Sequence, residues 1–325
     1  MEYRNLGNTG LKVSELCLGT MQFGWTADES TSHEILSEAF DNGINFIDTA
    51  DIYSRWAEGN PGGVSETIIG NWLDKSSIDR TQIILATKVR GITGEGPNDE
   101  GLSRLHIMTE IENSLRRLKT DYIDLYQAHW YDENTPIEET LSAFDDLIHQ
   151  GKVRYIGCSN YPAWRLVQAL WYADRVKVAR YDCIQPHYSL VHRAEFEHEL
   201  ADVCRTYGIG VIPYSPLGGG FLTGKYSQEE REVDSQRAKG VQRYFSKRNW
   251  QLLEIMEQIG SANDGKSISQ VALAWLLNSP LISSPIIGPR TMEQLQDNLG
   301  AAGFQLSSEE IILLDEASDP DQKGS

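Results

Sequence analysis

The feature that most constrains the fold of this chain is a regular alternation of short apolar runs, rich in β-branched residues, with longer amphipathic stretches. Eight runs have the composition of strands: SELCLGT (14–20), INFID (44–48), IILATK (83–88), YIDLYQAH (122–129), VRYIGCS (153–159), CIQPHYS (183–189), IGVIPYS (209–215) and SSPIIG (283–288). Helical periodicity covers residues about 32–42, 65–75, 103–118, 136–150, 161–173, 194–207, 267–279 and 291–301. Eight strands alternating with helices predict one domain over residues 1–325, a (β/α)8 TIM barrel.

A doubly wound sheet would share this alternation, but it uses a GxGxxG turn directly after a strand, and no strand-like run is followed by one. At the N-terminus, two extended pieces flank the turn residues 7–10, which predicts a β-hairpin that plugs the bottom of the barrel. The longest irregular segment is expected from Ser215 to about Ser246, and a loop of that length in a compact domain is usually either a functional lid or disordered.

Composition excludes several classes of partner. The chain has 29 basic and 47 acidic residues, a net charge of −18, so we expect binding neither to nucleic acid nor to a membrane surface. The four cysteines have no metal-ligand spacing, and neither an HxH pattern nor a carboxylate cluster predicts a metal site. The N-terminal residues lack the apolar stretch of a signal peptide, which makes the cytoplasm the expected location. Monomeric and homo-oligomeric states both stay open.

Polar residues end three consecutive strands of the predicted barrel. Asp48, Lys88 and His129 close their strand-like runs, and Tyr53 follows Asp48 in the loop above the strand. Because the carboxyl ends of barrel strands converge on one mouth, these four side chains are expected to face one cavity. Each alone has a structural explanation, as a helix cap, a packed aromatic ring, a solvated charge or a satisfied core histidine. Their coincidence at three neighbouring strand ends favours an active site.

Elementary electrostatics suggests a role for each group. A Lys88 ammonium beside ionised Asp48 stays charged, and a cation next to a phenol favours the phenolate. We therefore expect Lys88 to lower the pKa of Tyr53 below its usual value of about 10, making Tyr53 a general acid that protonates a carbonyl oxygen. His129 would orient that carbonyl and help polarise it.

With these residues in view, the chain resembles the aldo-keto reductase superfamily over almost its whole length. The matching motifs are LGTMQFG (18–24), GINFIDTADIY (43–53), SETIIG (65–70), ATKV (86–89), YQAHW (126–130), IGCSNY (156–161), IQPHYSL (184–190), PYSPLGGG (213–220) and IIGPRTMEQLQDN (286–298). They look closer to the bacterial and channel-β-subunit branches than to the mammalian aldose reductase branch. The resemblance implies that Asp48, Tyr53, Lys88 and His129 form the catalytic tetrad, and that the enzyme reduces an aldehyde or ketone with NADPH.

The resemblance also implies how the dinucleotide is held. Ser159, Asn160 and Gln185 match the residues that bind the nicotinamide carboxamide, and Tyr214 matches the ring that stacks on the nicotinamide. Residues Ser215, Leu217, Gly219 and Lys225 match the pyrophosphate segment, and Gly288, Arg290, Gln294 and Asn298 match the residues around the adenosine 2′-phosphate.

The chain departs from the better-known branch in this last group. Gly288 and Gln294 stand where that branch has a Lys and an Arg, so Arg290 alone clearly supplies charge there. NADPH is therefore expected, with NADH as a possible cofactor.

Aromatic residues in the loops near the tetrad are candidates for the substrate pocket. Trp25, Trp56, Trp130 and Tyr131 either form an aromatic wall for a carbonyl substrate or pack the loops onto the barrel. Arg55, which lies in the loop after Tyr53, either meets an acidic substrate or is a solvated charge.

Two other functions compete with carbonyl reduction. A regulatory subunit that binds NADP(H) for a channel-like partner, with little turnover, would keep the same tetrad. A lyase or hydrolase acting on phosphosugars would want the glycine-rich turn that PYSPLGGG provides, but the SNY and EQLxxN motifs resemble only the dinucleotide site.

Overall fold

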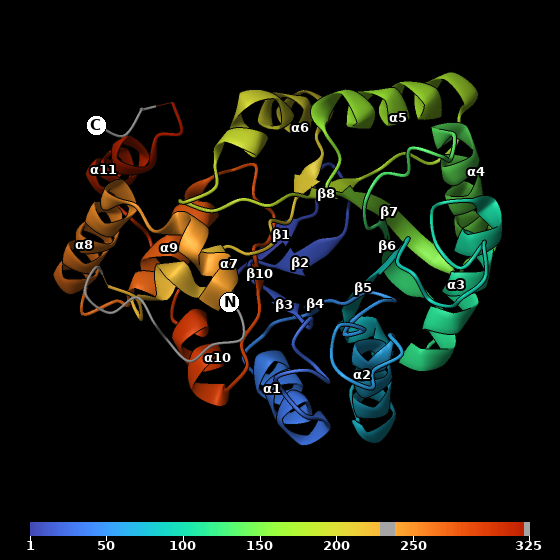
Figure 1. The fold of residues 1–325 in the computed structure, drawn as a ribbon, viewed down its shortest axis with the longest axis horizontal. Helices are drawn as coiled ribbons and strands as arrows, with labels where there is room; N and C mark the ends of the chain where they lie inside the picture. The colour runs from blue at the N-terminus through green and yellow to red at the C-terminus, as the bar shows by residue number, and fades with distance from the viewer. Residues whose placement is uncertain (228–237, 322–325) are drawn as a thin grey trace.

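The computed structural model describes residues 1–227 and 238–321, and it has the predicted barrel architecture (Figure 1). Its strands are β3 (Cys17–Gly19), β4 (Phe46–Asp48), β5 (Ile84–Val89), β6 (Ile123–Ala128), β7 (Val153–Ser159), β8 (Cys183–Gln185), β9 (Gly210–Val211) and β10 (Ile286–Ile287). All pair in parallel, in the order β10-β3-β4-β5-β6-β7-β8-β9. A bridge between Val211 and Ile282, with a 2.8 Å hydrogen bond from Ser283 N to Val211 O, closes the ring.

The helices surround this sheet as an outer layer (Figure 1). Those at the predicted places are α1 (Glu29–Asp41), α2 (Val64–Lys75), α3 (Arg104–Leu118), α4 (Ile137–His149), α5 (Ala163–Val176), α6 (Ala201–Tyr207), α9 (Ile268–Asn278) and α10 (Met292–Leu299). Helix α1 begins earlier than predicted because Asp28 accepts a hydrogen bond from Thr31 N and caps it. Helices α8 (Lys247–Ala262) and α11 (Ser308–Ser318), which the sequence analysis did not identify, pack against each other outside α9.

The irregular segment predicted from Ser215 to Ser246 contains short helical turns in its described parts. They are η3 (Gly218–Thr223), α7 (Ala238–Val241) and η4 (Gln242–Tyr244), and residues 228–237 lie outside the part of the chain that the structure describes. Over the described residues, no helix combines the length and apolar composition needed to cross a membrane.

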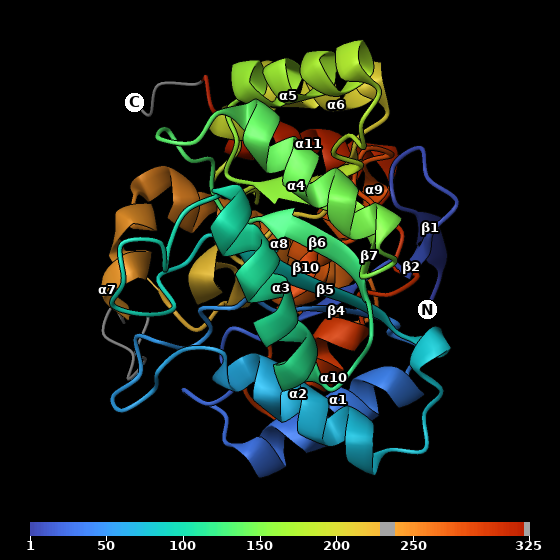
Figure 2. The ribbon, with the colours of Figure 1, turned by 90° about the vertical axis from the view of Figure 1, so that its right-hand side faces the viewer.

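The predicted N-terminal hairpin closes one end of the barrel. Its strands β1 (Tyr3–Asn5) and β2 (Lys12–Ser14) pair antiparallel, and they lie at the opposite end of the molecule from α7 (Figure 2). Leu6 and Val13 are fully buried and belong to the core cluster inside the barrel. Gly7, at φ 55°, lets the turn approach β9 closely, since a Cβ there would lie 2.4 Å from Gly210 N.

Alternation along the strands divides the barrel interior into layers of different chemistry. Side chains two residues apart on a strand point to the same side. The layer next to the hairpin is apolar and includes Cys17, Phe46, Ala86, Leu125, Cys183 and Ile286. Two residues further along the strands stand the buried polar residues Asp48, Lys88, Gln127, Ser159 and Gln185. The barrel therefore has a dry end and a polar end, and the polar end is where the strands finish.

Candidate active site

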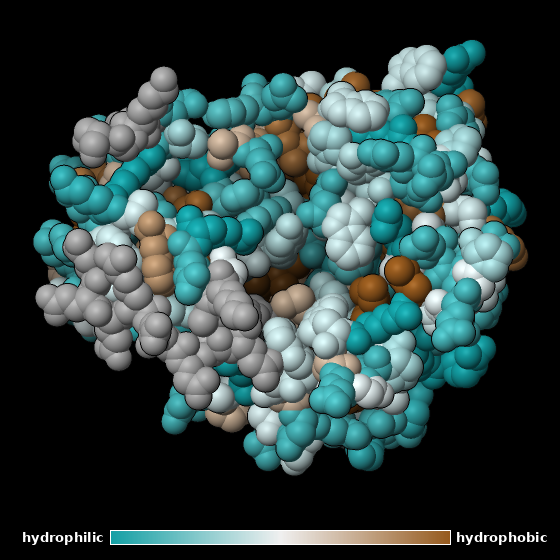
Figure 3. All heavy atoms as spheres, in the orientation of Figure 1, coloured by the Kyte–Doolittle hydropathy of each residue, from teal (hydrophilic) through white to brown (hydrophobic). Residues whose placement is uncertain are grey.

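A cavity of about 730 Å³ opens at the polar end of the barrel. In the view of Figure 3 the surface is hollowed near its centre, with hydrophobic residues deep in the hollow. Most of the site residues expected from the sequence line this cavity: Asp48, Tyr53, Trp56, His129, Trp130, Ser159, Asn160, Gln185, Tyr214, Ser215, Leu217, Gly219, Lys225, Gly288, Arg290, Gln294 and Asn298. Residues from both halves of the chain thus share one space.

Lys88 lies just behind the cavity wall and joins two of the tetrad candidates. Its ammonium Nζ is 2.5 Å from Asp48 Oδ2 and 3.1 Å from the hydroxyl of Tyr53, and it also donates to the carbonyl of Thr49 at 2.7 Å. The Lys88 side chain is fully buried and that of Asp48 is 3% exposed. All three hydrogens of the ammonium therefore have an acceptor, which fixes the orientation of the Tyr53 hydroxyl.

The second oxygen of Asp48 is held by two amides. Gln127 Nε2 and Gln185 Nε2 lie 3.0 Å and 2.9 Å from Asp48 Oδ1. Gln185 was expected at a cofactor carboxamide, whereas Gln127 was not singled out. The sequence signal for Gln127 is a polar residue inside a strand. It lies two residues after Leu125 and two residues before His129.

The charges in this cluster shift its pKa values in a way that corrects one expectation. Burial by itself would lower the pKa of Lys88, but Asp48 and Tyr53 outweigh it and the pKa is raised. Burial raises the pKa of Tyr53, and the neighbouring Lys88 lowers it by less, so the net shift is upward. The prediction that Lys88 brings the phenol below its usual range is wrong in this respect, because desolvation of the phenolate is the larger effect.

His129 stands beside this cluster as a neutral ring. Burial and the positive charges of Lys88 and Arg90 hold the pKa of His129 well below its usual range. The imidazole stacks on Trp130 at 3.8 Å and meets the Tyr53 ring edge-on at 5.8 Å. A neutral imidazole can donate one hydrogen bond, so this ring can orient a carbonyl oxygen beside the Tyr53 hydroxyl.

A linked set of polar groups lies at the ends of β7, β8 and β9. Asn160 Nδ2 donates to Ser159 Oγ and to the carbonyl of His129, both at 3.0 Å. The hydroxyl of Tyr214 donates to Asn160 Oδ1 at 2.9 Å, and the Tyr214 ring stacks on His187 at 5.0 Å. These contacts hold a polar rim and an aromatic face in place.

The segment after Tyr214 makes a turn that requires glycine. Gly218, Gly219 and Gly220 have φ values of 57°, 67° and 104°, in the region that side chains disfavour. A Cβ on Gly220 would lie 3.1 Å from Lys225 Nζ, so the ammonium sits close to this turn. A bare backbone next to a cation is a suitable cradle for a phosphate group.

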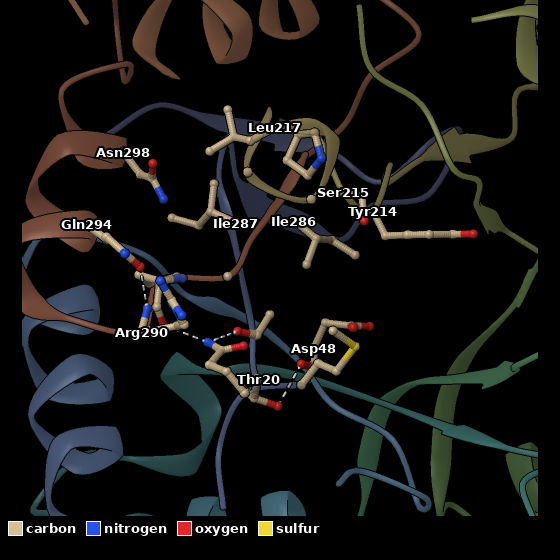
Figure 4. Close-up of a pocket in the computed structure, with 18 of the residues that line it drawn as sticks. Thr20, Asp48, Tyr214, Ser215, Leu217, Ile286, Ile287, Arg290, Gln294 and Asn298 are labelled. Carbon is tan, nitrogen blue, oxygen red and sulfur yellow. Dashed lines mark hydrogen bonds between the residues drawn. The ribbon is translucent and has the colours of Figure 1, made fainter. Parts of the chain in front are cut away.

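The far end of the cavity is built from the start of α10, as Figure 4 shows. Arg290 N donates to Gln294 Oε1 at 2.9 Å, and Thr291 caps the helix by accepting from Gln294 N. Gln22, which the sequence analysis did not select, ties this end to the barrel, because its amide bridges the carbonyls of Gly19 and Pro289 at 2.9 Å and 2.8 Å.

The aromatic residues near the tetrad separate into two positions. Trp56 and Trp130 line the main cavity. Trp25 lies outside it and packs edge-on against Trp56 at 5.9 Å. Tyr131 also lies outside it, on a neighbouring cavity of about 510 Å³ that shares Trp130.

Comparisons with known proteins show which proteins have a similar sequence. A family model described as "Aldo/keto reductase family" matches residues 15–319. The chain is 41% identical to the "Uncharacterized oxidoreductase YrpG" of Bacillus subtilis, over 97% of this chain and 95% of that protein. It is 35% identical to a "Probable voltage-gated potassium channel subunit beta" of Arabidopsis thaliana, over 93% and 91% of the two chains. It is 33% identical to "Protein tas" of Escherichia coli, over 97% of each chain.

The buried ion pair predicts a stability test. Lys88→Met should lower the free energy of unfolding by about 3–5 kcal/mol, because the Asp48 carboxylate stays buried without its cation. Adding Asp48→Asn to that variant removes the stranded charge and should recover most of the loss. Urea denaturation followed by circular dichroism measures both. If Lys88→Met and the double variant were equally stable, the unpaired charge of Asp48 would not be the cause of the lost stability.

The ring that supports Tyr214 predicts a dependence of stability on pH. Burial, with His192 and Arg243 adding to it, lowers the pKa of His187 to about 3. The unfolded chain binds that proton near pH 6.5, so this contribution is complete above about pH 6.5 and is lost as pH falls toward 3. Between pH 7.5 and 4.5 the original protein should lose about 2 kcal/mol more stability than His187→Gln. The exposed His149→Gln is the control, and a His187→Gln variant that behaves like it would contradict the prediction.

Proposed function

The chain belongs to the aldo/keto reductase family of oxidoreductases, and on that premise we propose that it reduces an aldehyde or ketone to the alcohol with NADPH. The observation that carries the proposal is the arrangement around Tyr53. Its hydroxyl lies 3.1 Å from a buried ammonium and beside a neutral imidazole, at the wall of the main cavity. That arrangement suits proton donation to a carbonyl oxygen.

In the proposed reaction the protein supplies the proton and the positioning. When bound, reduced nicotinamide supplies the hydride for the carbonyl carbon. His129 orients the carbonyl oxygen, and Tyr53 transfers its phenolic proton to that oxygen as negative charge develops there. The Lys88 ammonium stabilises the phenolate left behind, and Asp48 keeps the ammonium charged and in place. Tyr53 then regains a proton from solvent, which completes the balance.

The residues that line the cavity support binding of a dinucleotide. Ser159, Asn160 and Gln185 would bind the carboxamide, with Tyr214 against the nicotinamide face. The cradle at Ser215, Leu217 and Gly219, with Lys225 beside it, would hold the pyrophosphate. Gly288, Arg290, Gln294 and Asn298 would surround the adenosine phosphate. The fit rests on the glycine turn beside an ammonium and on the capped start of α10, where a helix N-terminus favours an anion.

A regulatory subunit would keep the same tetrad, so turnover separates it from a reductase. The buried Tyr53–Lys88 contact supports transfer of a proton, which retention of a dinucleotide does not need. Reduction of a carbonyl is therefore the function that these contacts support best.

The proton donor is tested by removing one oxygen atom. Tyr53→Phe should lower turnover by a factor of about 10²–10⁴, the usual contribution of a general acid. NADPH affinity should change little, because the phenol is assigned to the carbonyl and not to the dinucleotide. Loss of NADPH absorbance with a panel of aldehydes and ketones gives turnover, and quenching of tryptophan fluorescence gives affinity. Retained turnover in Tyr53→Phe would overturn the assignment.

Cofactor choice is tested at the adenosine end. In a chain with net charge −18, the extra phosphate of NADPH needs a local cation, and Arg290 can grip it through two parallel donors. Arg290→Ala should weaken NADPH binding about ten- to a hundredfold and leave NADH almost unchanged. Lys225→Ala is the matched control, since loss of a pyrophosphate contact should weaken both cofactors alike. Fluorescence titration that shows equal losses for both cofactors in Arg290→Ala would refute this role.

A further inference from the structure

We propose that the second cavity, beside the reaction cavity, binds an anionic group of the carbonyl substrate through Arg90. This cavity of about 510 Å³ is lined by residues of three loops, among them Ile52, Arg90, Ile92 and Trp130. Ile52 and Trp130 also line the main cavity, so the two cavities are neighbours, and the proposal places one substrate across both. The inference rests on the proposed carbonyl reduction and specifies its substrate class, an aldehyde or ketone that carries a carboxylate or a phosphate.

Arg90 has the properties of an anion receptor. It follows Lys88 by two residues, directly after the end of β5. Its guanidinium carbon lies 5.7 Å from the centre of the Trp130 ring. Its Nε is buried, and no group within the described chain accepts a hydrogen bond from it. A buried donor that stays unsatisfied is costly, so a ligand that pairs with it gains affinity.

The backbone conformation of Arg90 is a second, independent reason to expect that its side chain has a function. Arg90 has φ 133°, a conformation that glycine adopts readily and that other residues adopt at a cost of about 1–3 kcal/mol. The next residue, Gly91, is itself a glycine, whereas position 90 has an arginine. An arginine at such a position points to a function for its guanidinium group that offsets the strain.

Three acidic residues also line the cavity, and their charges compete with an anionic ligand. Both oxygens of Asp132 are engaged, accepting from Leu102 N and Asn134 N at 2.9 Å and from Thr135 Oγ1 at 2.7 Å. Glu100 and Glu133 are exposed at the rim, where water and salt screen their charges. Arg90 is half-buried, it is the one cation among the described residues that line this cavity, and it lies over the shared Trp130 ring.

A second cation reaches the same rim. Arg55, in the loop after Tyr53, donates a hydrogen bond to the carbonyl of Ile92, which lines the second cavity. Two guanidinium groups therefore lie near this cavity, against the three acidic residues that line it.

Trp130 is close to both groups that the substrate would contact. Its ring stacks on His129 at 3.8 Å, and the Arg90 guanidinium carbon lies 5.7 Å from its centre. An anionic group on a carbonyl substrate that reaches beyond Trp130 would therefore meet Arg90. Benzaldehydes with a charged para substituent carry such a group at the far end of a rigid ring, and the guanidinium can hold a carboxylate or phosphate through two parallel hydrogen bonds.

A charge series on one aromatic ring tests the inference. The probes are 4-formylbenzoate, 4-formylphenyl phosphate, the neutral methyl 4-formylbenzoate and the cationic 4-formyl-N,N,N-trimethylanilinium. With NADPH, kcat/KM should be about ten- to a hundredfold higher for at least one anionic probe than for the neutral ester. The better anionic probe identifies the group as carboxylate or phosphate. Equal values for all four, or a preference for the cation, would overturn the inference.

Substitutions distinguish the effect of the Arg90 side chain from the effect of the overall charge of the protein. Arg90→Met should abolish the preference for the anionic probe over the neutral ester, and Arg90→Lys should keep part of it. Arg175→Met is the matched control, because Arg175 also lies over a tryptophan, Trp171, but on an exposed part of α5. The control should keep the full preference. A preference that survives in Arg90→Met would assign it to another residue.

A binding measurement distinguishes this inference from the proposed function. Calorimetry of the NADP⁺-loaded protein with 4-(hydroxymethyl)benzoate and with its methyl ester needs no turnover. Stronger binding of the acid that disappears in Arg90→Met supports the anion site even if no aldehyde is reduced. Reduction of the neutral ester without any Arg90-dependent preference leaves the proposed function intact and removes the anion site.

Discussion

The site depends on one buried charge, the ammonium of Lys88 at the polar end of the barrel. An ion in a low-dielectric interior costs several kcal/mol unless close partners compensate it, and here Asp48, Thr49 and Tyr53 do so. Asp48 in turn needs donors for its second oxygen, which explains the buried amides of Gln127 and Gln185. The polar layer is thus one connected network, and each member is required by the charge of another.

The apolar end of the barrel makes this network effective. The hairpin residues Leu6 and Val13, with the layer that includes Phe46 and Leu125, fill the barrel beneath the polar residues. Electrostatic interactions are stronger where water is excluded, so the same packing that stabilises the barrel raises the influence of Lys88 on Tyr53. Many of the proposed ligand contacts come from loops, which can vary without disturbing this packing.

Much of this arrangement could be predicted from sequence because it follows from strand periodicity. The places of the eight strands, the hairpin and the convergence of Asp48, Lys88 and His129 require only alternation and barrel geometry. The upward pKa shift of Tyr53 could not be predicted, since it depends on the balance of burial against a charge at a known distance. Helix α11 carried a capping-box signal in Ser307 and Glu310, but it follows the last barrel unit and the alternation does not require it. The cavity at Arg90 is formed by loops distant in sequence, and no local pattern encodes such a meeting.

Closure of the ring has a consequence for how the chain acquires its structure during synthesis. The first barrel strand, β3, pairs with the last, β10, through Cys17–Ile286 and Leu18–Ile287. Contacts between residues so far apart in sequence carry a loop-closure entropy, and β10 leaves the ribosome long after β3. Until then one edge of β3 has no permanent neighbour, and the hairpin has no closed barrel to cap. The nascent chain therefore exposes apolar strand edges until β10 has emerged, which makes it a candidate for chaperone protection and for aggregation when β10 is truncated.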